Sequence, residues 1–292
     1  MTSSILSKVK FYFKCTVCAL IIAASALYGV ICSILLRIVG KIEYAQYSVA
    51  RTFFYTCRFL LGINIKIKNE HLLTELPAIV ISNHQSALDI HVLGRIFQPG
   101  YTVTSKDSLK YTPFLGWFML LSGTFFLNRS KSSQARKVLN GALQDLKNQK
   151  RALFMFPEGT RSASRSLDML PFKKGAFHLA KEAGIPIIPV VVSNTSTIFD
   201  AKNKIFNTGE INIEVLPPVS TACLETNEDV TKLCADVRKS MIDKLKSIGY
   251  SKVPGVKPNQ DDYSTEDEDE DENDTNSEIE VISEGTPLVS GD

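Results

Sequence analysis

The strongest constraint on this chain is an apolar run near its N-terminus. Between Lys14 and Arg37 lie 22 uncharged residues, CTVCALIIAASALYGVICSILL. As a helix, such a run is about 33 Å long, which matches a bilayer hydrocarbon core of roughly 30 Å. We therefore expect residues 1–62 to anchor the chain to a membrane. Basic residues flank both ends of the run, so the positive-inside rule leaves the orientation open.

Two other interpretations concern the same region. The triplet Ala24-Ser25-Ala26 resembles a signal-peptide cleavage site, but the apolar run continues past it and is longer than a usual signal-peptide core. A second apolar stretch, residues 51–63, is interrupted by Arg58 and is too short to span a bilayer. It is either an amphipathic helix in the membrane interface, paired with the first as a hairpin, or a helix of the protein core.

The charge is distributed unevenly along the chain. The net charge is only +2, but residues 261–292 hold 14 acidic and no basic residues, so residues 1–260 carry +16. A body this basic favours an anionic partner such as a nucleic acid, an anionic membrane or a phosphorylated substrate. Nucleic acid is disfavoured, because the body has no continuous basic stretch and no recognisable nucleic-acid motif. Residues 254–292 are acidic and poor in apolar residues, so we expect a disordered tail.

Cysteine and histidine usage gives no sign of a metal site. The six cysteines are either inside the apolar run or scattered, and the four histidines do not cluster with them. Zinc sites need such clusters at short, regular spacings. We therefore expect no metal.

Residues 63–253 alternate strand-like and helical patterns. Helical spacing of apolar residues is seen at 135–146 and 230–241, and strands are expected at 63–68, 78–82, 124–127, 152–156, 187–193 and 211–216. Such alternation predicts an α/β fold with a mixed, mostly parallel sheet flanked by helices. Ligands of these folds bind at the carboxyl ends of the strands, so polar residues there are candidates for the functional site.

One polar cluster follows the expected strand at 78–82. It reads NHQSALD and places His84 and Asp89 five residues apart, across a turn from strand to helix. A histidine held by a carboxylate can act as a general base, because the carboxylate fixes the tautomer and stabilises the imidazolium. A structural alternative remains, since Ser86 to Asp89 also reads as a helix-capping box.

Three further clusters carry groups suited to binding an anion. Arginine recognises phosphate with two hydrogen bonds, and glycine lets backbone N–H groups approach a ligand. A helix start also favours anions. The candidate ligand-binding residues are Glu158, Gly159, Thr160 and Arg161 in FPEGTRS, Arg129 in GTFFLNR and Lys173 in PFKKGAFHLA.

With these blocks in order, the sequence resembles the glycerophospholipid acyltransferases, and among them the fungal lysophosphatidic acid acyltransferases. NHQSALD, GTFFLNR, FPEGTRS and IPVVVS all match, and the resemblance spans roughly residues 15–250. It implies transfer of an acyl chain from acyl-CoA to the sn-2 hydroxyl of lysophosphatidic acid, giving phosphatidic acid. It also implies that His84 is the base, that Asp89 orients it, and that Arg129 and Arg161 hold the phosphate. Acyl-CoA is then a co-substrate, and no resident cofactor is expected.

The sequence departs from the family at one position. The second block usually ends in Asp-Arg, but here it ends in Asn128-Arg129, which can alter the orientation of Arg129 or the preferred acceptor. Asn128 also begins a glycosylation sequon, and a sugar there would obstruct the expected site. We therefore expect the site to face the cytosol, on the endoplasmic reticulum membrane or on a lipid droplet.

Two kinds of alternative function stay open. The acceptor could be glycerol-3-phosphate, dihydroxyacetone phosphate or another lysophospholipid, because the blocks are shared among these enzymes. The chain could also be a non-catalytic membrane protein that binds lipid. His84 and Asp89 argue against this second alternative, because binding a phosphate requires arginine and not a histidine–carboxylate pair.

Overall fold

The structure is a computed structural model that describes residues 5–127, 147–148 and 150–256. Three sequence predictions lie outside the described residues. They are the helix at 135–146, the position of Arg129 and nearly all of the acidic tail.

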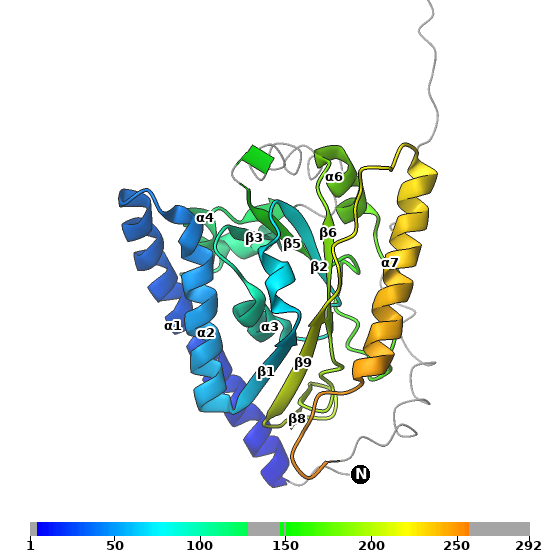
Figure 1. The fold of residues 1–292 in the computed structure, drawn as a ribbon. Helices are drawn as coiled ribbons and strands as arrows, with labels where there is room; N and C mark the ends of the chain where they lie inside the picture. Colours follow the sequence, from blue (N-terminus) through cyan, green and yellow to red (C-terminus); the bar gives the residue numbers. More distant parts are fainter. Residues whose placement is uncertain (1–4, 128–146, 149, 257–292) are drawn as a thin grey trace, which may run out of the picture.

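A seven-stranded sheet runs through the centre of the protein, in the order β1-β9-β6-β2-β5-β3-β4 (Figure 1). Every neighbouring pair is parallel except β6 and β9. The predicted mixed, mostly parallel sheet is therefore confirmed. Its strands are β1 (Ile63–Lys68), β2 (Ala78–Ser82), β3 (Tyr101–Lys106), β4 (Phe125–Leu127), β5 (Ala152–Met155), β6 (Ile187–Val192) and β9 (Gly209–Val215). A separate two-stranded sheet pairs β7 (Phe199–Asp200) with β8 (Ile205–Phe206).

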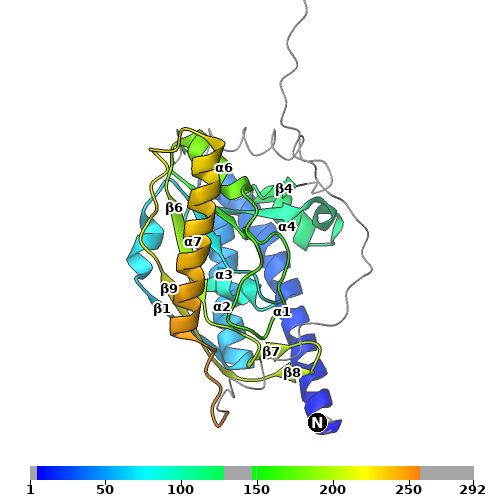
Figure 2. The ribbon, with the colours of Figure 1, turned by 90° about the vertical axis from the view of Figure 1, so that its right-hand side faces the viewer.

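Helices cover both faces of the sheet, which explains the continuous apolar runs in its central strands. In β2, Val80 packs with the cluster on one face, while Ile79 and Ile81 pack with the cluster on the other. Figure 2 shows α6 (Gly175–Ala183) and α7 (Asn227–Ile248) in front of the sheet, with the N-terminal helices behind it. The helices of that second face are α1 (Ile5–Ile38), α2 (Ala45–Leu61) and α3 (Asp89–Ile96).

Short helical segments connect these elements. The 3₁₀ turns are η1 (Ile42–Tyr44), η2 (Glu70–Thr74) and η3 (Asp107–Tyr111). The segment η3 leads into α4 (Leu115–Leu121), which packs against α1.

The first two helices form a hairpin. Helix α1 is long and apolar enough to cross a membrane, by length and composition. Helix α2 begins at Ala45, six residues before the expected start. Its Phe53 and Phe54 lie in the core, whereas Tyr55 and Phe59 are exposed. The helix therefore has one face in the core, as the second interpretation expected, and exposes large apolar residues on the other.

Helix α1 is also part of the core. Phe11 and Ile21 belong to the same hydrophobic cluster as the sheet residue Val80. Farther along, Gly29 allows α4 to approach closely, because a Cβ at this position would lie 2.5 Å from Cδ2 of Phe118. The expected membrane anchor and the expected catalytic domain thus share one packed interior.

The packing of α6 gives a first prediction. Phe177 is fully buried in the cluster between the sheet and α7, so Phe177→Ala should lower the free energy of unfolding by about 3–5 kcal/mol. Thermal unfolding of the detergent-solubilised chain measures this as a lowered melting temperature. The control Ser240→Ala changes an exposed residue of α7 and should have an effect within about 0.5 kcal/mol. Equal melting temperatures for the two variants would contradict the packing.

Candidate active site

The site forms where the carboxyl ends of three parallel strands meet. Strand β2 lies between β5 and β6 and is parallel to both, so the loops that follow them are neighbours. Asn83 and Gln85, in the loop after β2, hydrogen-bond to the end of β6. The amide nitrogens of both side chains donate to the carbonyl of Val192, over 2.9 and 3.0 Å. These two residues, which the sequence analysis did not single out, fix the loop that carries His84.

His84 and Asp89 are held together. The His84 Nδ1 lies 2.6 Å from Oδ2 of Asp89. Because a carboxylate only accepts, Nδ1 donates, and in the neutral imidazole the lone pair is then on Nε2. The same oxygen accepts the backbone N–H groups of Gln85 and Ser86, over 2.7 and 3.1 Å. Asp89 therefore orients the imidazole and also holds the loop that leads into α3. The expected capping box is only half formed, because the Ser86 hydroxyl accepts the N–H of Leu88 and not that of Asp89.

The surroundings of His84 differ from those of the nearby His91. The His84 ring stacks on Phe156 at 3.9 Å between centroids, and its side chain is 14% exposed at the edge of a cavity. His91 is buried against Phe54, and its Nε2 donates to the carbonyl of Ile63. Burial lowers the pKa of His91 to about 4. His84 is therefore the histidine that is placed to exchange a proton with a ligand.

Glu158 occupies a different place from the one expected. It is only 3% exposed, and its two carboxylate oxygens accept the backbone N–H groups of His84 and Leu170, over 2.6 and 2.9 Å. Burial raises the pKa of Glu158, and these two hydrogen bonds oppose the shift. The sequence analysis grouped Glu158 with residues that touch substrate. In the structure its carboxylate points to the backbone, where it positions His84.

The other residues of FPEGTRS lie at the opening of the site. Gly159 has a φ of +74°, and a Cβ there would come within 2.9 Å of Cε of Lys173, so the lysine side chain lies across this glycine. Thr160 and Arg161 are exposed, and Arg161 lines the same cavity as His84. The structure thus brings Gly159, Arg161 and Lys173 to one region. Arg129 lies outside the described residues, two positions after the end of β4.

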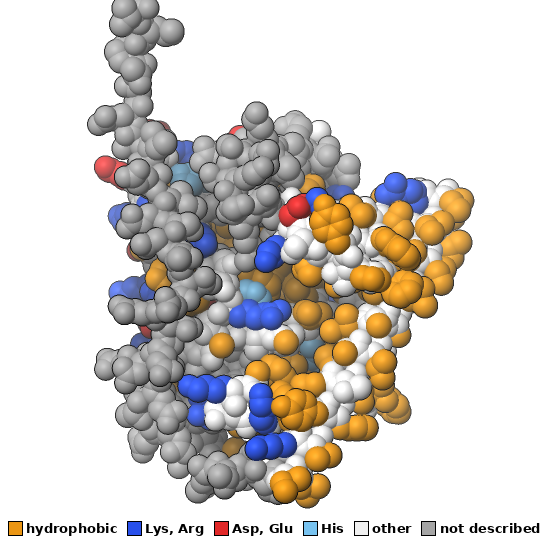
Figure 3. Space-filling view, turned by 180° about the vertical axis from the view of Figure 1, so that it is seen from behind, with side chains coloured by type: hydrophobic (Ala, Val, Ile, Leu, Met, Phe, Trp, Pro, Cys, Tyr) orange, Lys and Arg blue, Asp and Glu red, His pale blue; other side chains and the backbone are white. Residues whose placement is uncertain are grey.

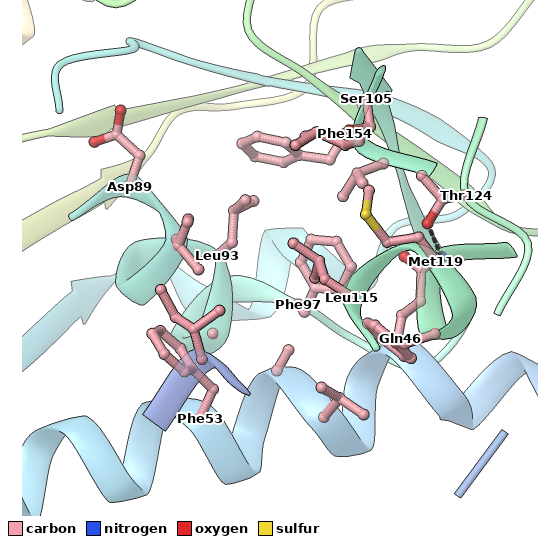
Figure 4. Close-up of a pocket in the computed structure, with 18 of the residues that line it drawn as sticks. Gln46, Phe53, Asp89, Leu93, Phe97, Ser105, Leu115, Met119, Thr124 and Phe154 are labelled. Atoms are coloured by element: carbon pink, nitrogen blue, oxygen red, sulfur yellow. Dashed lines mark hydrogen bonds between the residues drawn. The ribbon is translucent and has the colours of Figure 1, made fainter. Parts of the chain in front are cut away.

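An apolar cavity of about 300 Å³ extends from His84 and Asp89 into the layer of helices. Its walls come from α1, α2, α3, α4, β3 and β5, and they are mostly aliphatic and aromatic. Figure 4 shows Asp89 at one end and Gln46 with Thr124 at the other, with Leu93 and Phe154 between them. The Gln46 amide donates to the hydroxyl of Thr124 over 3.2 Å. Sequence reasoning missed this cavity, because its walls come from ordinary apolar residues of separate elements.

The site combines an imidazole, a guanidinium and an apolar cavity. The Nε2 of His84 is not used by Asp89, and His84 and Arg161 both line the cavity. Among the described residues, no group of three or more His, Cys, Asp or Glu side chains lies close enough to hold a metal ion.

Comparison with known proteins decides the family. The sequence model of the acyltransferase domain matches residues 64–193. The 1-acyl-sn-glycerol-3-phosphate acyltransferase of Saccharomyces cerevisiae is 50% identical over 248 residues, covering 85% of this chain and 82% of the yeast protein. The chain belongs to the acyltransferase family. The human 1-acyl-sn-glycerol-3-phosphate acyltransferase beta is 33% identical over 234 residues, 80% of this chain and 82% of the human one.

A solved structure supports the same assignment. The crystal structure of the 1-acyl-sn-glycerophosphate (LPA) acyltransferase from Thermotoga maritima superposes with a TM-score of 0.63 at 25% identity. The match covers 83% of this acyltransferase and 95% of the bacterial chain. The sheet and its helical layers are therefore those of this family.

The position of Glu158 gives a second prediction. Glu158→Ala leaves the buried N–H groups of His84 and Leu170 without their acceptors, at a cost of about 1–3 kcal/mol each. Without its acceptor, the backbone of His84 should shift and move the imidazole. The kcat for acyl transfer should then fall about ten- to a hundredfold, with a smaller change in KM.

Two further variants separate positioning from a charge effect. Glu158→Gln keeps one carbonyl acceptor and should recover part of the lost kcat. Glu75→Ala removes an exposed carboxylate and should leave kcat unchanged. A Glu158→Ala variant that raises only the KM would show that Glu158 contacts substrate instead.

Proposed function

We propose that this acyltransferase transfers an acyl chain from acyl-CoA to the sn-2 hydroxyl of lysophosphatidic acid, giving phosphatidic acid. One observation carries the proposal: His84, with Nδ1 on Asp89, lies at the mouth of an apolar cavity that Arg161 also lines. The names of the yeast, human and bacterial relatives support the choice of acceptor.

The proposed chemistry follows from the free Nε2 of His84. The acceptor hydroxyl attacks the thioester carbonyl carbon while its proton passes to Nε2. An ester C–O bond forms, the C–S bond breaks, and CoA leaves as a thiolate that takes the proton back. Asp89 stabilises the imidazolium in between, and such base catalysis contributes about 10²- to 10⁴-fold to the rate. No acyl-enzyme is needed and no resident cofactor is proposed.

The two halves of the lipid substrate match the two parts of the site. The apolar cavity accepts an acyl chain, because its walls offer mostly carbon atoms. Arg161 binds the acceptor phosphate, and Lys173 adds a second positive charge near Gly159. Thr160 and Arg129, which the sequence analysis also assigned to substrate, belong to this proposal. Holding the phosphate places the hydroxyl beside His84, which lowers the entropy cost of the reaction.

The membrane is the proposed location, because the substrate and the product are both lipids. Helix α1 supports attachment by its length and apolar composition. We place the protein on the endoplasmic reticulum membrane or the lipid droplet, with His84 facing the cytosol, where acyl-CoA is made available. The pathway is then phospholipid and triacylglycerol synthesis.

The reaction is tested with purified full-length chain in lipid vesicles and labelled oleoyl-CoA. Lysophosphatidic acid, glycerol-3-phosphate and lysophosphatidylcholine are offered in parallel, and we expect phosphatidic acid from the first. His84→Ala should lower this rate at least about a hundredfold, since it removes the base. The control His71→Ala replaces an exposed histidine of η2 and should keep the rate of the unmodified chain.

The other outcomes are equally informative. Product from another acceptor alone would replace lysophosphatidic acid in the proposal. Undiminished activity of a folded His84→Ala variant would show that the pair of His84 and Asp89 is structural. A folded, vesicle-bound chain without any product would favour a lipid-binding protein.

The role of Arg161 gives a separate prediction. Arg161→Ala removes a charge-assisted hydrogen bond to the phosphate, so kcat/KM for lysophosphatidic acid should fall about ten- to a hundredfold. Steady-state kinetics should show the rise in KM for lysophosphatidic acid and little change in the KM for oleoyl-CoA. Lys239→Ala removes an exposed positive charge from α7 and serves as the control. A rise confined to the KM for oleoyl-CoA would reassign Arg161 to the CoA phosphates.

A further inference from the structure

The segment from η3 to α4 exposes a row of large apolar side chains. Tyr111, Phe114, Trp117 and Leu120 are 76%, 42%, 54% and 54% exposed. We refer to these four residues as the α4 ridge. Exposed residues of this size cost free energy in water, so a ridge of four requires an explanation.

The α4 ridge is held in place by packing beneath it. A Cβ at Gly116 would lie 2.1 Å from the carbonyl oxygen of Lys110, so only glycine lets α4 fold this tightly against η3. The Phe114 ring lies edge-on to Trp117 at 5.4 Å, and Phe114 has a φ of +59°. Such a backbone conformation is costly for a bulky residue and persists only where its surroundings enforce it.

The inner side of α4 already has a function in the fold. Leu115, Phe118 and Met119 line the apolar cavity, and Phe118 also packs at Gly29 of α1. At the end of α4, the Arg37 guanidinium donates to the carbonyl of Leu121 over 2.8 Å. The α4 ridge, on the outer side, is therefore not needed to close the core. Contiguous exposed apolar residues of this kind mark a surface that contacts another molecule or a membrane.

The surroundings of the α4 ridge indicate a lipid surface. Figure 3 shows apolar side chains gathered along α1, continuing at its upper end over α4. Helix α1 carries further large exposed apolar residues, among them Leu27, Ile31 and Ile34. Trp and Tyr, both present in the α4 ridge, are the residues enriched where hydrocarbon meets the head groups. A surface continuous with a helix long enough to cross a membrane fits the same bilayer.

The basic residues next to the α4 ridge also indicate a lipid surface. Lys106 and Lys110 precede it, and Arg37 and Lys41 lie at the end of α1. Asp107 is the acidic residue of η3, and it is paired with Lys110 over 2.8 Å. Asp107 offsets the charge of Lys110, so the attraction to anionic head groups comes from Lys106, Arg37 and Lys41, each by about 1 kcal/mol.

We propose that the α4 ridge is a second membrane-contacting element, which inserts into the boundary between head groups and acyl chains beside α1. This placement goes beyond the proposed reaction. In this placement, one side of α4 contacts the bilayer and the opposite side lines the cavity. Only the thickness of α4 then separates the two.

The chain provides its own probe, because Trp117 is the only tryptophan. Full-length protein is reconstituted into vesicles of phosphatidylcholine and phosphatidylserine, and vesicle flotation confirms that it is bound. The fluorescence of Trp117 is then quenched by phosphatidylcholine brominated at shallow or deep acyl positions, or by iodide in the water. We expect several-fold stronger quenching by the shallow bromine label than by iodide.

A matched variant shows that the pattern depends on position. In the double variant Trp117→Phe with Ala235→Trp, the tryptophan lies on exposed α7, across the sheet from the N-terminal helices. It should be quenched by iodide and be insensitive to the brominated lipids.

Two results would overturn the proposal in vesicle-bound protein. Quenching of Trp117 by iodide and not by bromine would leave the α4 ridge in water. Protection from both quenchers would mean that protein covers it, for example a second copy of this chain. Neither readout requires catalysis, so failure of the proposed reaction and failure of this membrane contact are distinguishable.

Discussion

Asp89 Oδ2 accepts three hydrogen bonds, from the His84 ring and from the backbone N–H groups of Gln85 and Ser86, and the geometry of the site depends on them. The carboxylate that orients the imidazole also holds the loop that leads into α3. The position of this helix against the sheet therefore sets the direction of the imidazole. Glu158 contributes from the opposite side by accepting the His84 backbone N–H, so both the backbone and the ring of His84 are held by buried carboxylates.

Much of the fold is readable from the sequence, because local rules decide it. The apolar run in β2 requires cover on both faces, and the structure supplies it through separate clusters around Val80 and Ile81. The turn that joins His84 to Asp89 is equally local, since five residues cross from strand to helix. These predictions needed no knowledge of the rest of the chain.

The role of Glu158 and the apolar cavity could not be predicted from the sequence, because both depend on contacts between distant residues. Glu158 looked like a ligand-binding residue because FPEGTRS is polar, but only the fold brings it to the N–H groups of His84 and Leu170. The cavity is not local either. Its walls join residues such as Ser25 of α1 and Phe154 of β5, which no periodicity or motif connects.

The same non-local packing limits how the protein can be divided. A boundary after residue 62 looks natural in the sequence, since Gly62 ends α2 and β1 begins at Ile63. In space, however, Ser25 and Ala26 of α1 and Phe53 of α2 line the cavity that begins at His84. Removing residues 1–62 would therefore remove walls of the site as well as the expected anchor, and would open the core to water. The expected attachment to a membrane and the shape of the cavity therefore involve the same two helices.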